Sequence, residues 1–168
     1  MIENTANSRI IEKVKNTIIK ELIQDNDFLK ALNVPNDQSN AEDVLGTYIF
    51  DYHQNPNTIE KVQSFITIQV HLPEVLHIDP NRITALIEIW IYSHYKNMKI
   101  TNIPKIRCNR NDYLSMLLDS KLNGRTDLGI GTVKLKGNIE GTFQPDYLFR
   151  NMTFEVAAIN NSPCNNED

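Results

Sequence analysis

The sequence predicts an α+β fold, with two helices packed on a mainly antiparallel sheet of about five strands, in the order helix, three strands, helix, two strands. Two segments carry apolar residues at helical spacing, and five others alternate apolar with polar residues or are rich in β-branched and aromatic types. Short connections join neighbouring strands, which favours antiparallel pairing with both helices on one face.

The chain has the length of one ordinary domain, at 168 residues. We expect residues 1–159 to form that domain, and residues 160–168, which carry almost no apolar side chains, to form a disordered tail. The sequence shows no signal peptide and no apolar run of about 20 residues. We therefore expect synthesis in a cytoplasm and no membrane partner.

The first helix is predicted over residues 7–32. The run Asp25-Asn26-Asp27 is a weak point at which this helix would break or kink, and Val34-Pro35 ends it because proline disfavours a helical conformation in the residue before it. The apolar stripe of the helix is Ile10, Ile11, Val14, Ile18, Leu22 and Ile23.

Three strands are predicted next, over residues 47–52, 64–72 and 83–95. The second alternates cleanly, which indicates a half-buried strand. The third has isoleucines at alternate positions, a pattern that favours a strand over a helix of the same length. Its other face carries Trp90 and Tyr92.

The second helix is predicted over residues 110–122, with Asn109 or Asn111 as its N-cap and Gly124 just past its end. Two strands complete the fold, over residues 132–136 and 147–159. In the last strand Arg150 falls on the apolar face, which is a local conflict with the pattern.

The motifs of common active sites are missing from the sequence. Gly129-Ile130-Gly131 is neither a dinucleotide-binding nor a P-loop pattern, and no nucleophile elbow occurs. The histidines lack metal-ligand spacing, and Cys108 and Cys164 are interpreted as free thiols. We therefore expect no catalytic, cofactor or metal site, and a protein that is not an enzyme.

The net charge of −4 and the pI near 5.6 argue against a dedicated nucleic-acid-binding protein, although they leave room for a local basic patch. We expect no specific nucleic-acid binding.

Apolar residues on both faces of the predicted strands indicate a contact between subunits, because two helices cannot cover both faces of a sheet. A sandwich-like closure of the sheet would bury the same residues, and the sequence favours neither alternative. The candidate interface residues are Phe50, Tyr52, Trp90, Tyr92, Tyr147 and Phe149.

Five segments of the chain together suggest a known family: 47–50, 64–70, 111–124, 128–131 and 147–150. In their order and texture these segments resemble phage tail terminator or neck (tail-completion) proteins. The resemblance implies a structural virion protein, made in the bacterial host and assembled as a ring, commonly a hexamer. Such a ring closes the tail tube, contacts the tube protein, and binds a head-side connector or head-completion protein. The loops 51–60, 73–82 and 124–131 are the expected contacts with these neighbours.

Three alternatives stay open, one of them a nucleic-acid-binding module, which would need a basic stripe that the sequence does not show. Another is a head-tail connector or head-closure neck protein, with the same logic and a different neighbour. The last is a small bacterial enzyme or ligand-binding domain, whose pocket would use His71, Glu88 and His94 on one sheet face.

Overall fold

The structure, a computed structural model, describes residues 8–73 and 82–159. Five strands form one sheet in the order β1-β2-β3-β5-β4, in which β1 runs parallel to β2 and every other pair is antiparallel. The strands are β1 (Ile49–Phe50), β2 (Ser64–His71), β3 (Arg82–His94), β4 (Lys134–Phe143) and β5 (Tyr147–Ile159). The predicted α+β class is confirmed. The predicted tail at 160–168 lies outside the described residues.

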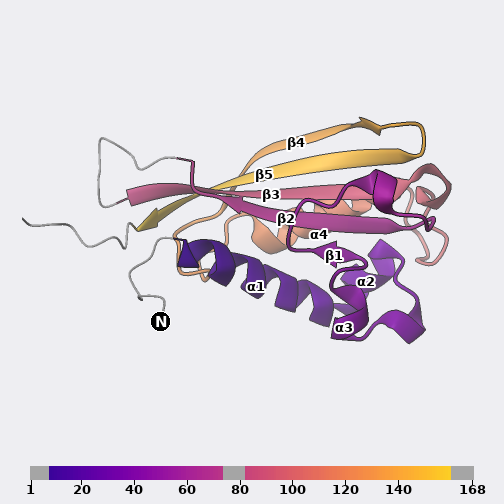
Figure 1. Cartoon of the computed structure of the whole chain (residues 1–168), viewed down its shortest axis with the longest axis horizontal. Helices are drawn as coiled ribbons and strands as arrows, with labels where there is room; N and C mark the ends of the chain where they lie inside the picture. The colour runs from indigo at the N-terminus through magenta and orange to yellow at the C-terminus, as the bar shows by residue number, and fades with distance from the viewer. Residues whose placement is uncertain (1–7, 74–81, 160–168) are drawn as a thin grey trace, which may run out of the picture.

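Two long helices accompany the sheet, α1 (Arg9–Gln24) and α4 (Arg110–Leu122). Figure 1 shows α1 running alongside the sheet, where it contacts β2, while α4 contacts β3, β4 and β5. The shorter elements are α2 (Asn26–Leu32), α3 (Ala41–Val44) and the 3₁₀ turns η1 (Asn36–Gln38), η2 (Pro56–Thr58) and η3 (Tyr95–Asn97).

The helical segment predicted over 7–32 forms two helices, α1 and α2, because the chain breaks at the predicted weak point. Asp25 has an extended backbone conformation, with φ −92° and ψ 99°, and its side chain accepts hydrogen bonds from the backbone N–H groups of Asp27 and Phe28. This is the geometry of a helix N-cap, so Asp25 ends α1 and begins α2.

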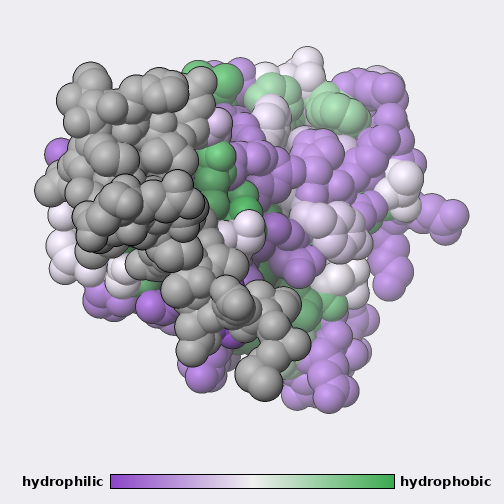
Figure 2. Space-filling view, turned by 60° about the vertical axis from the view of Figure 1, so that its left-hand side comes forward, coloured by the Kyte–Doolittle hydropathy of each residue, from purple (hydrophilic) through white to green (hydrophobic). Residues whose placement is uncertain are grey.

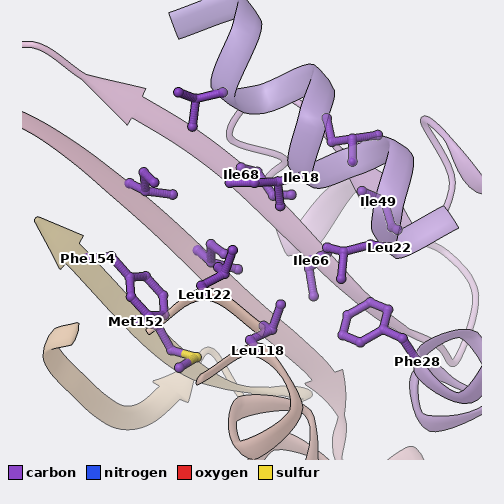
Figure 3. Close-up of a cluster of buried hydrophobic side chains, with 14 of the residues drawn as sticks. Ile18, Leu22, Phe28, Ile49, Ile66, Ile68, Leu118, Leu122, Met152 and Phe154 are labelled. Carbon is purple, nitrogen blue, oxygen red and sulfur yellow. The ribbon is translucent and has the colours of Figure 1, made fainter. Parts of the chain in front are cut away.

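The buried core lies between the helices and one face of the sheet. Figure 3 shows Ile18 and Leu22 of α1 and Leu118 and Leu122 of α4 gathered over side chains of β2 and β5. The alternate isoleucines of β3 belong to the same cluster, as the pattern of the predicted third strand requires. The strand residues on this face are Ile66, Ile68, Val70, Ala85, Ile87, Ile89, Ile91, Met152, Phe154 and Val156.

The strands at the two edges of the sheet differ most from prediction. β1 is two residues long, where 47–52 was predicted. β4 begins two residues later than the predicted 132–136 strand and continues to Phe143. β4 pairs with β5 as far as the residue pair Phe143–Tyr147, and the register of the pairing shifts between Leu135 and Gly137.

Candidate functional site

The sheet face turned away from the main core carries an aromatic cluster. Phe65 stacks on Tyr92, with ring centroids 5.1 Å apart, and Tyr92 stacks on Trp90 at 5.9 Å. Phe149 lies 5.1 Å from Trp90. These residues alternate with the core isoleucines along their strands, so they project from the opposite face. The sheet therefore has two hydrophobic layers, one on each face.

The loop after β1 covers part of this aromatic face. Pro56 of η2 is buried and Ile59 packs against the cluster. His53 meets the rings of Trp90 and Tyr92 edge-on, at 6.1 and 6.5 Å. The loop 51–60, which was predicted to contact neighbouring proteins, thus packs against the aromatic face of its own sheet.

The six predicted interface residues are brought to this one face, at different depths. Phe50, Tyr92 and Tyr147 are buried within the chain, at 3%, 1% and 5% exposure. Burial raises the pKa of Tyr92 to about 12, with a further contribution from the Glu88 carboxylate. Tyr52 is 52% exposed, and Trp90 and Phe149 are partly exposed. An interface role for the six residues thus stays a prediction. Only Tyr52, Trp90 and Phe149 have exposed side-chain surface that a partner could contact.

A polar group lies beside the aromatic cluster on the same face. The Glu88 carboxylate accepts a hydrogen bond from the Asn151 amide at 2.9 Å and lies 3.2 Å from the Nε2 atom of His71. Thr153 donates to Asn151 at 3.3 Å. The group combines one acid and one imidazole at the surface, where His71 is half exposed.

The three residues of the proposed ligand pocket share one sheet face, as predicted, but only His71 and Glu88 lie close together. His71 is paired with Leu86, and His94 follows eight residues later along β3. At the rise of an extended strand this is about 27 Å. His94 instead stacks on Tyr95 at the far end of the sheet.

A hollow of about 400 Å³ lies where α4 begins, between the helix and the β4–β5 pair. The buried Asn111 donates to the carbonyl oxygen of Leu148, while its own Oδ1 atom has no partner among the described residues. The hollow is lined by Met98, Asn109, Asn111, Glu140, Gly141, Thr142, Leu148 and Phe149.

Metal-ligating side chains do not gather within the described parts of the chain: no three His, Cys, Asp or Glu residues there are placed to hold an ion. No helix among those residues is long and apolar enough to cross a membrane. Cys108 is a free, partly buried thiol. On the part of Figure 2 that belongs to the described residues, most of the surface is hydrophilic, and hydrophobic residues show in small separate areas.

One exposed residue of the site was missed from the sequence. Ile139 of β4 is 62% exposed, the largest value among the exposed large hydrophobic residues of the described chain. The apolar residues of β4 recur every fourth position, at Leu135, Ile139 and Phe143, so no two-residue period is visible. The turn sequence Gln144-Pro145-Asp146 before β5 is the signal that would have indicated a hairpin.

A family model, YomW, matches residues 16–156. The chain belongs to the YomW family. The matched residues run from within α1 to within β5, so the aromatic face, the edge strand β4 and the hollow beside α4 all lie inside the YomW match. No curated protein matches the chain.

Proposed function

We propose that this protein is a phage tail terminator, a structural subunit that forms a ring at the head-proximal end of the tail and joins the tail tube to the head-side connector. The resemblance of its segments to tail terminator and neck proteins supports the proposal. The observation that carries it is the presence of two unlike free edges on one sheet.

The first free edge is β4. It pairs with β5 along one side only, and all of its residues are exposed or partly exposed. The second is the end of β2, because β1 pairs only with Ile66 and Thr67 and no described strand adjoins Ile68–His71 on that side.

Two unlike edges favour head-to-tail assembly. An unpaired strand presents a row of N–H and C=O groups that another strand can complete. When one edge of a subunit contacts a different edge of the next, the interface is heterologous, and such contacts close into rings when the rotation permits. Ile139 on β4 and the exposed Tyr52 would then supply apolar contact area beside the joined strands.

The test is the solution mass by light scattering, with negative-stain imaging of any large species. We expect a closed ring with a central hole, in the free protein or after addition of tail tube protein. Ile139→Lys should abolish the ring while leaving the melting temperature nearly unchanged, because the residue is exposed. The matched control is Met116→Lys on α4, which removes a side chain of 53% exposure from a surface outside the proposed contact.

A monomer at all concentrations, with and without tube protein, would contradict the proposal. A ring that binds a head protein but does not bind tube protein would favour the related function of a head-closure or connector subunit.

The hollow beside α4 favours a second candidate, a small ligand-binding domain, since about 400 Å³ is within the size range of ligand pockets. A thermal-shift screen in which Asn111→Ala removes a ligand response would support that candidate.

A further inference from the structure

We infer that the connection between β3 and α4 binds the phosphate backbone of nucleic acid. This connection, residues 95–109 and here named the basic loop, carries Lys96, Lys99, Lys105 and Arg107 and no acidic residue. The acid-free stretch extends from residue 89 to residue 111 in a protein whose net charge is −4. The basic loop is therefore a locally positive stretch of a chain that is negative overall.

The four cations of the basic loop are available for a ligand. Each side chain belongs to an exposed residue. None of them forms an ion pair with a carboxylate of the described residues. Elsewhere the chain does pair its cations, for example Arg125 with Glu21 and Lys136 with Glu155. Unpaired lysines and arginines are the groups that neutralise phosphates and release counterions.

A buried arginine fixes the shape of the basic loop. Arg110, 1% exposed, donates to the carbonyl oxygens of Asn97 at 2.7 Å and Lys99 at 3.3 Å, and also to Ala31 of α2. The Asn102 side chain donates to the carbonyl oxygen of Lys30 at 2.6 Å. These bonds hold the basic loop against α2, whose exposed Lys30 therefore lies next to the loop in the chain fold.

The aromatic residue at the start of the basic loop favours nucleic acid over an acidic peptide as the partner. Tyr95 is 50% exposed, its ring stacks on His94 at 4.7 Å, and the Lys96 ammonium lies 5.6 Å from the ring centroid. An unpaired base can stack on a half-exposed aromatic ring that has cations beside it. The Tyr95 backbone N–H donates to the carbonyl oxygen of Asp146, so an acidic residue adjoins the Tyr95 end of the basic loop. We place the phosphate contacts at Lys99, Lys105 and Arg107.

Each subunit holds the whole basic loop, so the inference does not depend on ring assembly. It agrees with the expectation of no specific recognition, since cations on a backbone and stacking on a base are both tolerant of sequence.

The experiment measures fluorescence anisotropy of labelled single strands and duplexes of about 20 nucleotides, from about 50 to about 200 mM salt. We expect binding at low salt that weakens steeply as salt rises. The triple variant Lys99→Gln, Lys105→Gln, Arg107→Gln should lose about tenfold or more in affinity. The matched control, Lys13→Gln, Lys20→Gln, Lys134→Gln, removes the same charge from exposed positions on α1 and β4 and should bind like the natural protein.

Tyr95→Ala should weaken binding of the single strand more than binding of the duplex, because only the single strand offers unpaired bases. Absence of binding at the lowest salt would overturn the inference, and so would equal losses in the two triple variants. A glutamate-rich peptide that displaces the single strand as well as unlabelled DNA does would also overturn it, in favour of an acidic protein partner. Circular dichroism checks that each variant is folded.

Discussion

Arg150 on β5 forms an ion pair with Asp112 on α4, across the gap between the sheet and the helix that covers it. This contact explains why a charged residue stands on an apolar strand face: α4 places a carboxylate over it. Arg150 also reaches Glu140 and Asn138 of β4, both at 3.1 Å. A single guanidinium thus joins α4, β5 and β4.

The partners of this ion pair should respond unequally to removal. Asp112→Ala leaves the largely buried guanidinium without its nearest carboxylate, and we expect it to lower the free energy of unfolding by about 2 kcal/mol. Arg150→Met keeps the apolar stem and removes the charge, so its cost should be smaller. Urea unfolding measures both values. A larger loss in Arg150→Met would mean that the guanidinium contributes mainly through its contacts with β4.

Arg110 should be among the least replaceable residues of the chain. Arg110→Met removes donors to three backbone carbonyl oxygens in a buried place, and each unsatisfied group costs about 1–3 kcal/mol. We expect a loss of about 3 kcal/mol or more in urea unfolding, together with faster amide exchange over residues 97–103. Arg110→Lys keeps the charge but not the fork of donors, so it should recover little. Unchanged exchange in Arg110→Met would show that the basic loop holds its shape without this anchor.

Asp25 should make the stability of the protein depend on acid pH. Burial raises the pKa of Asp25, but hydrogen bonds from Lys121 and from the N–H groups of Phe28 and Asp27 outweigh it, and the pKa falls below its ordinary 3.8. A carboxyl group with a lowered folded pKa stabilises the fold above its unfolded pKa, and this contribution disappears as the pH falls through the folded pKa.

Asp25→Ala should therefore cost about 1 kcal/mol at neutral pH and progressively less below pH about 4. The measurement is urea unfolding of the two proteins across that range. A stability difference that does not change with pH would assign the effect to the geometry of the cap and not to its charge.

Two glycines of β4 should differ sharply on substitution. A Cβ atom at Gly141 would lie 2.7 Å from the Phe149 ring, whereas one at Gly137 would meet nothing within 4 Å. Gly141→Ala should displace Phe149 and lower the free energy of unfolding by about 1 kcal/mol or more. Gly137→Ala should be neutral or slightly stabilising, since alanine restricts the unfolded chain. Thermal melting compares them, and equal melting temperatures would show that the ring moves aside freely.

Periodicity predicted the interior of the fold well and its edges poorly. The limits of α4 and β5 were predicted to the residue, because capping residues bound α4 and turn residues precede β5. β4 was half missed because an edge strand with water on much of both faces has no need to alternate. The pairing of Arg150 with Asp112 depends on where α4 crosses the sheet, which no local pattern records.

The sequence predicted which aromatic residues share a sheet face, but not how far each of them is buried. Alternation correctly indicated that Trp90, Tyr92, Tyr147 and Phe149 share a face. It did not predict that the loop after β1 folds over part of that face and buries Phe50 and Tyr92. The basic loop was not singled out from the sequence, because its cations lie mostly outside helices and strands and no local pattern shows that Arg110 anchors the loop.

The position of β5 between β3 and β4 bears on how the protein is made. A nascent chain that has reached residue 146 holds every element except β5, and at that stage β3 and β4 have no strand to join them. The isoleucines of β3 would then border an open edge that invites pairing with other chains. Translation therefore passes through an aggregation-prone stage that only the last strand relieves. A stop codon just before residue 147 should send the product into inclusion bodies.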